Sequence, residues 1–359
     1  MSGKIKIVWS DFAPGEAAGR REFFCSAEAA AGAFPDFAAE LEALRQAYRT
    51  ECAERGIADH DKLLLRFHLS DAANQGPRLR ELLAGRPASI VDQPPATGSR
   101  VALEAWCLAD ATDANVRVAY SPRLAEGDSR AQMHTLFSQL GSAVTASGGS
   151  LADNVLRTWI YCRDVDNNYP GVVHGRNAVF DRHGMTERYL ASTGIGGGSD
   201  EPRQLVAMDA LLCSGTPPEQ TPLRALDHLS PTALYGVRFE RAMRVGWHDR
   251  DWLIVSGTAS IDHKGNVLYP GDIRRQSRRV VENIAALLAE GGAGLPDVRT
   301  AAVYLRDTAE LPIVREVFDA AFPGIPLVYL RAPVCRPAWL VECECLAVRA
   351  AAHPDAPEL

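Results

Sequence analysis

A pattern that occurs three times constrains the fold of this 359-residue chain more than any other feature of its sequence. Each copy is an apolar segment ending in Ser-Asp or Arg-Asp, followed by a short helical segment, a loop and a second apolar segment. The copies lie in residues 63–109, 156–213 and 298–348. A repeat of this kind indicates that one supersecondary unit is used several times.

The segments around the second and third copies predict further elements. Residues 131–150 and 274–294 each predict a helix, and a Gly-Gly pair ends the second of them. Residues 251–272 predict a strand, a turn and a second strand. Together these elements predict an α+β fold in which helices pack on one face of mixed β-sheets.

A linker separates the second copy from the third. Residues 213–234 are rich in Pro, Ser and Thr and have no strand or helix period. We therefore expect a domain boundary near Thr221. The N-terminal domain, residues 1–220, would hold two partial copies, and the C-terminal domain, residues 221–359, would hold one nearly complete copy.

Composition and charge narrow the function classes. The chain is 47% hydrophobic and 23% charged, as is typical of soluble globular proteins. Its formal net charge of −7 gives no support for nucleic acid or an anionic membrane as a partner. No apolar run reaches the ~18 residues that span a bilayer, and the N-terminus has no signal-peptide pattern. We expect a cytoplasmic protein with reduced cysteines that acts on a small molecule.

Aligning the last strands of the three copies singles out one acid. "VALEA", "VAMDA" and "VECEC" superpose without gaps, so that Glu104, Asp209 and Glu344 are equivalent. An acid that recurs in every copy fits a role in the shared architecture, at a strand end or edge. Glu342 differs, because the other two copies have alanine at its position. The architecture does not require an acid there.

Two interpretations of Glu342 remain open at this point. A strand glutamate is usually salt-bridged or exposed at an edge. On an apolar strand near Trp339, however, the side chain would be partly desolvated, which would raise its pKa. A carboxylic acid that keeps its proton near neutral pH can act as a general acid.

The quoted motifs carry a resemblance to known families. Through "VSGTASID", "GDIRRQSRRVVENIAALL", "VRTAAVYLRD" and "VECECLAV", the third copy resembles the RidA/YjgF family. Through "FHLSDAANQGP", "IVDQPPATGSRVAL", "VHGRNAVFDRHG", "YLASTGIGGG" and "VCRPAWLVECE", the whole chain resembles the chorismatases, which cleave chorismate and have two RidA-like domains. The resemblance therefore implies two RidA/YjgF-like domains with the catalytic acid in the C-terminal one.

The resemblance also implies a reaction that needs no metal and no cofactor. Glu342 would protonate the enolpyruvyl ether of chorismate and release pyruvate, and Arg331 would hold a substrate carboxylate. A Cys at the place of Cys335 accompanies members that form 3-hydroxybenzoate. Hydrolytic members, which release 3,4-dihydroxycyclohexa-1,5-diene carboxylate, have another residue there. Ala259, in the "SGTAS" turn, would line the pocket.

Chorismate has two carboxylates, for which arginine offers planar, bidentate recognition. Besides Arg331, the candidates are Arg157, Arg163 and Arg176, and an ordinary surface or ion-paired arginine is the alternative for each. Arg157 shares one strand face with Tyr161. We include Tyr161 among the expected substrate contacts.

A glycine-rich segment, "STGIGGG", provides further candidates. Backbone N–H groups at Gly194, together with the hydroxyls of Ser192 and Thr193, could cradle a carboxylate. A flexible connector is the alternative.

Other functions and assemblies stay open. A RidA-like hydrolase of imines or enamines would use the same Glu and Arg, and a ligand-binding module without turnover is a second alternative. Because internal copies can replace subunits, both a monomer and a homotrimer are compatible with the sequence.

Overall fold

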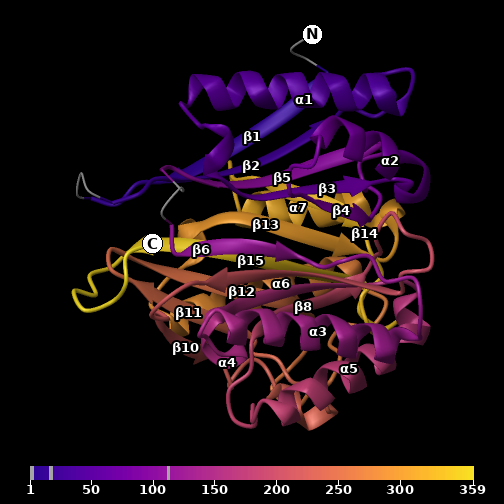
Figure 1. The fold of residues 1–359 in the computed structure, drawn as a ribbon. Coiled ribbons are helices and arrows are strands. Elements are labelled where there is room, and N and C mark those ends of the chain that lie inside the picture. The colour runs from indigo at the N-terminus through magenta and orange to yellow at the C-terminus, as the bar shows by residue number, and fades with distance from the viewer. Residues whose placement is uncertain (1–3, 16–18, 111–113) are drawn as a thin grey trace.

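Three units, each built on its own β-sheet, make up the molecule (Figure 1). The computed structural model describes residues 4–15, 19–110 and 114–359. Each sheet has one parallel pair of strands, and its other neighbours are antiparallel. The predicted α+β class with mixed sheets is therefore confirmed.

The first unit has strand order β1-β2-β5-β3-β4 and two helices. Its elements are β1 (Ile5–Phe12), β2 (Glu22–Ala29), α1 (Phe37–Glu54), β3 (Lys62–Leu69), α2 (Ala72–Leu83), β4 (Ser89–Asp92) and β5 (Val101–Leu108).

The second unit has strand order β6-β9-β7-β8. Its elements are β6 (Val116–Tyr120), α3 (Ser129–Ala146), α4 (Leu151–Asn154), β7 (Val155–Cys162), α5 (Val165–Arg182), β8 (Ala191–Gly196) and β9 (Val206–Cys213).

The third unit has strand order β10-β11-β12-β15-β13-β14. Its elements are β10 (Glu219–Leu223), β11 (Ala242–Trp247), β12 (Arg250–Ala259), α6 (Ile273–Glu290), β13 (Val298–Leu305), α7 (Leu311–Ala321), β14 (Leu327–Arg331) and β15 (Val341–Ala350). The domain boundary expected near Thr221 falls within β10, which pairs with β11. The division into two domains stays a prediction.

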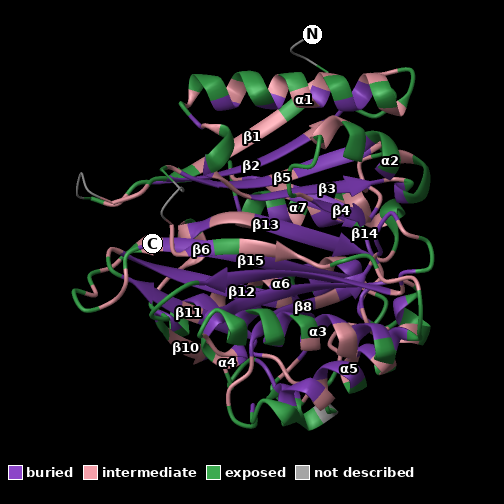
Figure 2. Ribbon diagram, in the orientation of Figure 1, coloured by how far each residue is buried: buried purple, intermediate pink, exposed green. Residues whose placement is uncertain are grey.

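Alternating side chains of the strands form two kinds of core. On β5, Leu103 and Ala105 pack in the cluster beneath α1 and α2, whereas Trp106 and Leu108 face a cluster shared by all three units. Figure 2 shows the result: most residues of the inner strands are buried, and α1, α2, α3 and α5 carry exposed residues. The helices therefore lie outside and the sheets meet inside.

The predicted hairpin over residues 251–272 is only half correct. β12 forms, but its hairpin partner is β11, which precedes it. After β12, the Asp262 carboxylate accepts the backbone N–H groups of Lys264 and Asn266 at 2.9 and 2.8 Å. These bonds close a tight turn, after which the only pairing with the end of β12 is the single bridge of Ile261 with Val267.

Backbone hydrogen bonds join each unit to the other two. Ala96 N–H donates to Tyr329 O at 2.8 Å, and Asp92 N–H donates to Gly198 O at 2.8 Å. Gly196 N–H donates to Pro333 O at 2.9 Å, so that β8 lies against the loop that leads into β15. This last junction forms one wall of the site described below.

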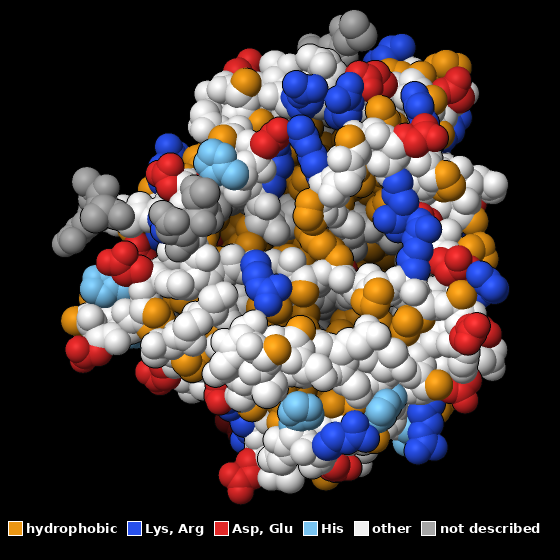
Figure 3. Space-filling model, viewed as in Figure 1, with side chains coloured by type: hydrophobic (Ala, Val, Ile, Leu, Met, Phe, Trp, Pro, Cys, Tyr) orange, Lys and Arg blue, Asp and Glu red, His pale blue; other side chains and the backbone are white. Residues whose placement is uncertain are grey.

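On the face seen in Figure 3, the surface is hollowed between the first and second units, and hydrophobic side chains gather in the hollow. Charged side chains of both signs surround it. In the part of the chain that the structure describes, no helix is long and apolar enough to cross a membrane.

Candidate active site

A cavity lies between the second and third units. Its empty space, including the part open to solvent, measures about 540 Å³. Its walls come from α5, β8, the segment before β11, β12 with Ile261 two positions beyond its end, the loop before β15, and β15. The lining residues are Tyr169, Arg176, Ser192, Gly194, Val237, Phe239, Arg241, Gly257, Ala259, Ile261, Cys335, Arg336, Trp339 and Glu342.

Glu342, the second residue of β15, lies at the inner wall of this cavity and is 5% exposed. A bulge in β12 between Val255 and Thr258 brings Gly257 against the Glu342 carboxyl. A methyl group at Gly257 would overlap with Glu342 Oε1, so only glycine leaves room for the carboxyl there.

Burial is the largest cause that raises the pKa of Glu342, and the charge of Glu344 raises it as well, whereas the charge of Arg241 lowers it. Together these effects bring the pKa to about 8. The carboxyl therefore carries its proton at neutral pH, as expected for a desolvated acid beside Trp339, which lines the same cavity.

Arg176 brings a buried positive charge to the cavity from α5. It is 3% exposed, and its Nε and Nη2 have no hydrogen-bond partner among the described residues. Burial also lowers its pKa. Because a buried polar group without a partner is costly, this guanidinium suits an anionic ligand in the cavity.

β8 supplies a polar wall. The Ser192 N–H donates to Ser256 Oγ at 2.9 Å, and Ser192 Oγ accepts from Thr158 Oγ1 at 2.8 Å. Thr193 Oγ1 accepts the Gly257 N–H at 2.9 Å. Gly194 faces the Tyr169 ring, where a Cβ would lie 3.0 Å from the ring edge.

The predicted glycine-rich loop is therefore wrong in its conformation. Ser192, Thr193 and Gly194 belong to strand β8, which pairs in parallel with β7. Since backbone groups of β8 are engaged by β7 and by the third unit, the segment does not form an open cradle for a carboxylate. Its contribution to the cavity is small, close-packed wall residues.

The loop before β15 closes the other side. Cys335 is half-buried in it, and burial raises the pKa of its thiol to about 12, so that the thiol is neutral. Trp339 Nε1 donates to Ser260 O at 3.2 Å, and the Arg336 guanidinium lies 5.1 Å from the Trp339 ring centre. Ala259 is the direct strand partner of Glu342.

The structure thus brings many of the predicted site residues together. Those that line the cavity are Glu342, Arg176, Ser192, Gly194, Cys335 and Ala259. Thr193 lies immediately behind the wall, through its contact with Gly257. Arg331 lies elsewhere: it is exposed at the end of β14, and its backbone N–H donates to Pro94 O of the first unit at 2.8 Å.

Arg157 and Tyr161 also lie outside this cavity. Arg157 Nη2 forms an ion pair with Glu344 Oε2 at 2.7 Å, and the Tyr161 hydroxyl donates to Asp209 Oδ2 at 3.2 Å. Both residues are on the face of β7 that turns toward the shared core. The expected role of Arg157 as a free carboxylate anchor is contradicted, because its partner is an acid of this chain.

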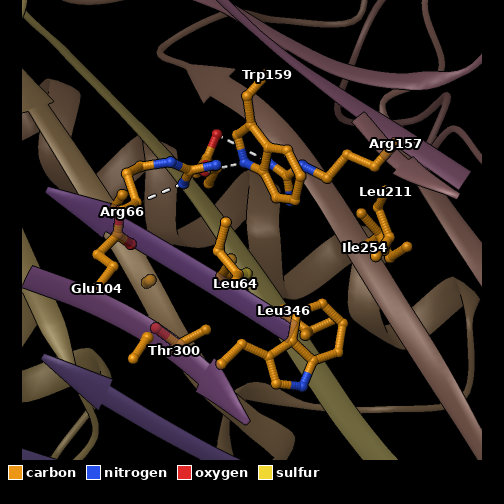
Figure 4. A pocket seen from close by; sticks show the side chains of 15 residues that line it. Leu64, Arg66, Glu104, Arg157, Trp159, Leu211, Ile254, Thr300 and Leu346 are labelled. Atoms are coloured by element: carbon orange, nitrogen blue, oxygen red, sulfur yellow. Dashed lines mark hydrogen bonds and ion pairs between the residues drawn. The ribbon is translucent and has the colours of Figure 1, made fainter. Parts of the chain in front are cut away.

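That shared core contains a second cavity, shown in Figure 4, whose charged lining residues form ion pairs with one another. Trp159 lies between two guanidinium groups, with Arg66 at 4.5 Å and Arg157 at 4.6 Å from its ring centre (Figure 4). Arg66 pairs with Glu104 at 3.3 Å and with Asp209 at 3.5 Å.

The three recurring acids meet in this core. Asp209 and Glu344 are buried and Glu104 is partly buried, and all three are paired on the central strands of the sheets, not at strand ends or edges. Their architectural role agrees with the sequence pattern, but the expected location at a strand end or edge is wrong.

Sequence reasoning missed several cavity residues. Arg241 is buried, and its Nη2 donates to Ser230 O at 3.1 Å. It belongs to "RFERAMR", where no pattern distinguishes one arginine from its neighbours. Tyr169, Phe239 and Arg336 were also missed, because no sequence pattern distinguishes them from their neighbours. Among the residues that the structure describes, no cluster of three His, Cys, Asp or Glu side chains could hold a metal.

Comparisons with known proteins agree with this architecture. Residues 237–349 match the family described as Endoribonuclease L-PSP. A 3-hydroxybenzoate synthase of Streptomyces hygroscopicus is 31% identical over 222 residues, covering 53% of this chain and 62% of that protein. A RutC family protein of Pyrococcus abyssi is 37% identical over 84 residues, covering 23% of this chain and 63% of that protein. Each match thus spans about three fifths of the relative's length.

A solved structure extends the similarity to most of the chain. The crystal structure of a chorismatase superposes with a TM-score of 0.64 at 21% identity, and covers 81% of this chain and 94% of that one. The resemblance in fold that the sequence motifs indicated is therefore confirmed.

Proposed function

Because the chain shares the fold of the chorismatases, which are built on RidA-like domains, we propose that it cleaves the enolpyruvyl ether of chorismate. The products would be pyruvate and 3-hydroxybenzoate. One observation carries the proposal: a single cavity contains a buried carboxyl that keeps its proton, at Glu342, and a buried guanidinium at Arg176 whose Nε and Nη2 have no hydrogen-bond partner among the described residues.

Glu342 is the proton donor in this proposal. Its proton passes to the methylene carbon of the enolpyruvyl group, which makes an oxocarbenium ion at the ether carbon. The neighbouring hydroxyl on ring carbon C4 captures this ion as a cyclic ketal and gives up its proton, which restores the acid. The bond from C4 to that oxygen then breaks, and loss of the proton on C3 completes the aromatic ring. The ketal carbon leaves as pyruvate, and the former ether oxygen stays on C3 and takes up a proton as the phenol. The atoms of chorismate are then all accounted for in the two products, and no water is consumed.

Arginines supply the charge that a dianion needs. Arg176 offers its unpaired Nε and Nη2 to one substrate carboxylate as a planar, charge-assisted pair. Arg241 and Arg336 line the same cavity and add positive charge around the second carboxylate. With Glu342 neutral, the cavity is complementary to a substrate with two negative charges.

The product branch depends on the wall beside the acid. Cys335 and Ala259 both line the cavity next to Glu342, and the neutral thiol of Cys335 cannot activate water as a base. A wall of this kind favours capture by the ring hydroxyl, which gives 3-hydroxybenzoate. Capture by water would give the dihydroxycyclohexadiene carboxylate.

Incubating the purified protein with chorismate tests the proposal. Pyruvate is followed by a coupled assay and the ring product by chromatography, with Glu342→Gln alongside. We expect pyruvate and 3-hydroxybenzoate in equal amounts from the wild type and loss of both in the variant. Pyruvate with the non-aromatic diene would refute the product assignment. If the wild type forms no pyruvate, the proposed reaction is wrong.

A further inference from the structure

Two acidic side chains lie on the same face of strand β15. Glu342 and Glu344 are two residues apart on β15, so their side chains leave the same face about 7 Å apart along the strand. Both are 5% exposed. Glu342 points into the cavity, whereas Glu344 reaches across to β7 of the second unit.

Contacts from β7 hold Glu344 in place. Trp159 Nε1 donates to Glu344 Oε1 at 2.8 Å, and Arg157 Nη2 lies 2.7 Å from Glu344 Oε2. The Oε1 atom therefore accepts a hydrogen bond, whereas Oε2 is ion-paired with Arg157 and has no hydrogen-bond partner among the described residues. A negative charge is thereby fixed inside the protein, close to the acid of the cavity.

The same arginine connects this pair to the cavity wall. Arg157 Nη2 also donates to Thr193 Oγ1 at 3.0 Å, and Thr193 Oγ1 accepts the N–H of Gly257 at 2.9 Å. Gly257 is the residue against which the carboxyl of Glu342 lies. Glu344 is therefore connected to the wall beside Glu342 through its ion pair with Arg157, two hydrogen bonds at Thr193 and the packing of Gly257 against the Glu342 carboxyl.

We propose that Glu344 is a positioning residue for the reaction, whose fixed negative charge keeps the neighbouring Glu342 carboxyl in its protonated form. This inference rests on the proposed function, because it assigns a role toward the acid of that reaction. Two carboxyl groups this close in a buried site do not both ionise readily. The paired one, Glu344, takes the charge, and Glu342 keeps the proton.

The first and second units provide an internal comparison. Glu104 and Asp209 occupy the place of Glu344, but Ala102 and Ala207 occupy the place of Glu342. The recurring acid is thus present in all three units, and only the third unit has a second carboxyl two residues before it on the same strand. A purely architectural acid would behave alike in all three.

Other titratable or charged groups lie around Glu342. They are Tyr169 and Arg176 on α5, Arg241 before β11, Tyr304 on β13, Cys335 and Arg336 in the loop before β15, and Glu344 on β15. Besides burial itself, Glu344 favours the protonated form of Glu342 and Arg241 favours the ionised form.

The pH profile of Glu344→Gln is the test. The protonated donor is present below its pKa, so activity is lost as the pH rises through that value. Removing the charge of Glu344 should move this loss about 1 pH unit lower, as expected for two charges about 7 Å apart in a partly screened interior. At low pH, kcat of the variant should stay close to that of the wild type, whereas the falling limb of the pH profile, where activity is lost, should move.

Two control variants separate charge from architecture. Glu344→Asp keeps the charge, and Glu104→Gln removes the equivalent acid of the first unit, which pairs with Arg66 at 3.3 Å and His68 at 2.7 Å. We expect the limb to stay in place in both. An unchanged limb in folded Glu344→Gln, or an equal shift in Glu104→Gln, would overturn the proposal.

A direct titration keeps this test independent of the reaction. The C=O stretch of protonated Glu342, identified by its absence in Glu342→Gln, can be followed against pH by difference infrared spectroscopy. The same shift is expected there, even if the wild type releases no pyruvate from chorismate. If Glu344→Gln does not fold, because it leaves Arg157 buried without a partner, the double variant with Arg157→Gln replaces the pair by two neutral amides and carries the same expectation.

Discussion

Replacing Arg176 with methionine should stabilise the protein while weakening its ligand binding. Arg176 is 3% exposed, and its Nε and Nη2 have no hydrogen-bond partner among the described residues. Each buried donor left unsatisfied costs ~1–3 kcal/mol, and the buried charge adds to this. Methionine has a similar length, suits the interior of α5 and has no donor to satisfy. We therefore expect the free energy of unfolding to rise by about 2 kcal/mol.

The same change should remove a substrate anchor. Losing one partner of a buried, hydrogen-bonded charge pair costs ~2–5 kcal/mol, which corresponds to at least a ~30-fold loss of affinity. KM for chorismate should rise by about that factor. Chorismate should also protect the wild type against unfolding more strongly than it protects the variant.

Urea unfolding without ligand, followed by initial-rate kinetics, measures both effects. Arg163→Met is the matched control, because Arg163 is satisfied: it pairs with Asp92 at 3.0 Å and donates to Ser199 O at 2.9 Å. That variant should lose stability. The reasoning is refuted if Arg176→Met unfolds at lower urea than the wild type, or if its KM is unchanged.

The remaining predictions concern the acid and its wall. Since burial raises the pKa of Glu342 to about 8, activity measured between pH 6 and 10 should fall as the pH rises through about 8, and a rate that increases over that interval would contradict the acid role. The same group, with an unfolded pKa near 4.5, makes the wild type lose free energy of unfolding as the pH rises from about 4.5 toward 8; Glu342→Gln should lack this dependence in urea titrations at several pH values. Gly257→Ala places a methyl group on Glu342 Oε1 and should lower kcat ~100-fold while circular dichroism stays native. Cys335→Ala opens the wall beside the acid, so chromatography should show more diene carboxylate relative to 3-hydroxybenzoate.

Much of the fold could be predicted because it depends on short-range pattern. The repeated segments become β3, β7 and β13 with the helices that follow, and the apolar stripe of residues 274–294 becomes α6. Glu342 could be found because the copies differ at one position of one strand, which needs no knowledge of packing. α1 shows the limit, since the comparison of copies gave no signal for it.

The rest of the site depends on how the units pack, which strand periodicity does not determine. Alternation correctly puts Arg157 and Tyr161 on one face of β7, but only the third unit decides that this face is covered by Glu344 and its neighbours. Arg331 is likewise turned toward the first unit. Arg176 could be named as a candidate, yet its lack of a partner is visible only in three dimensions.

The stack in the shared core has a consequence for symmetry. Arg66, Trp159 and Ala302 hold equivalent places, because they pair with Glu104, Asp209 and Glu344 respectively on the neighbouring strands. Three identical subunits around a threefold axis would have to place the same side chain at all three, and three buried guanidiniums would repel one another. A single polypeptide is free of that requirement and can place a guanidinium, an indole ring and a methyl group at the three equivalent places. An assembly of three copies of one unit would lose this asymmetry.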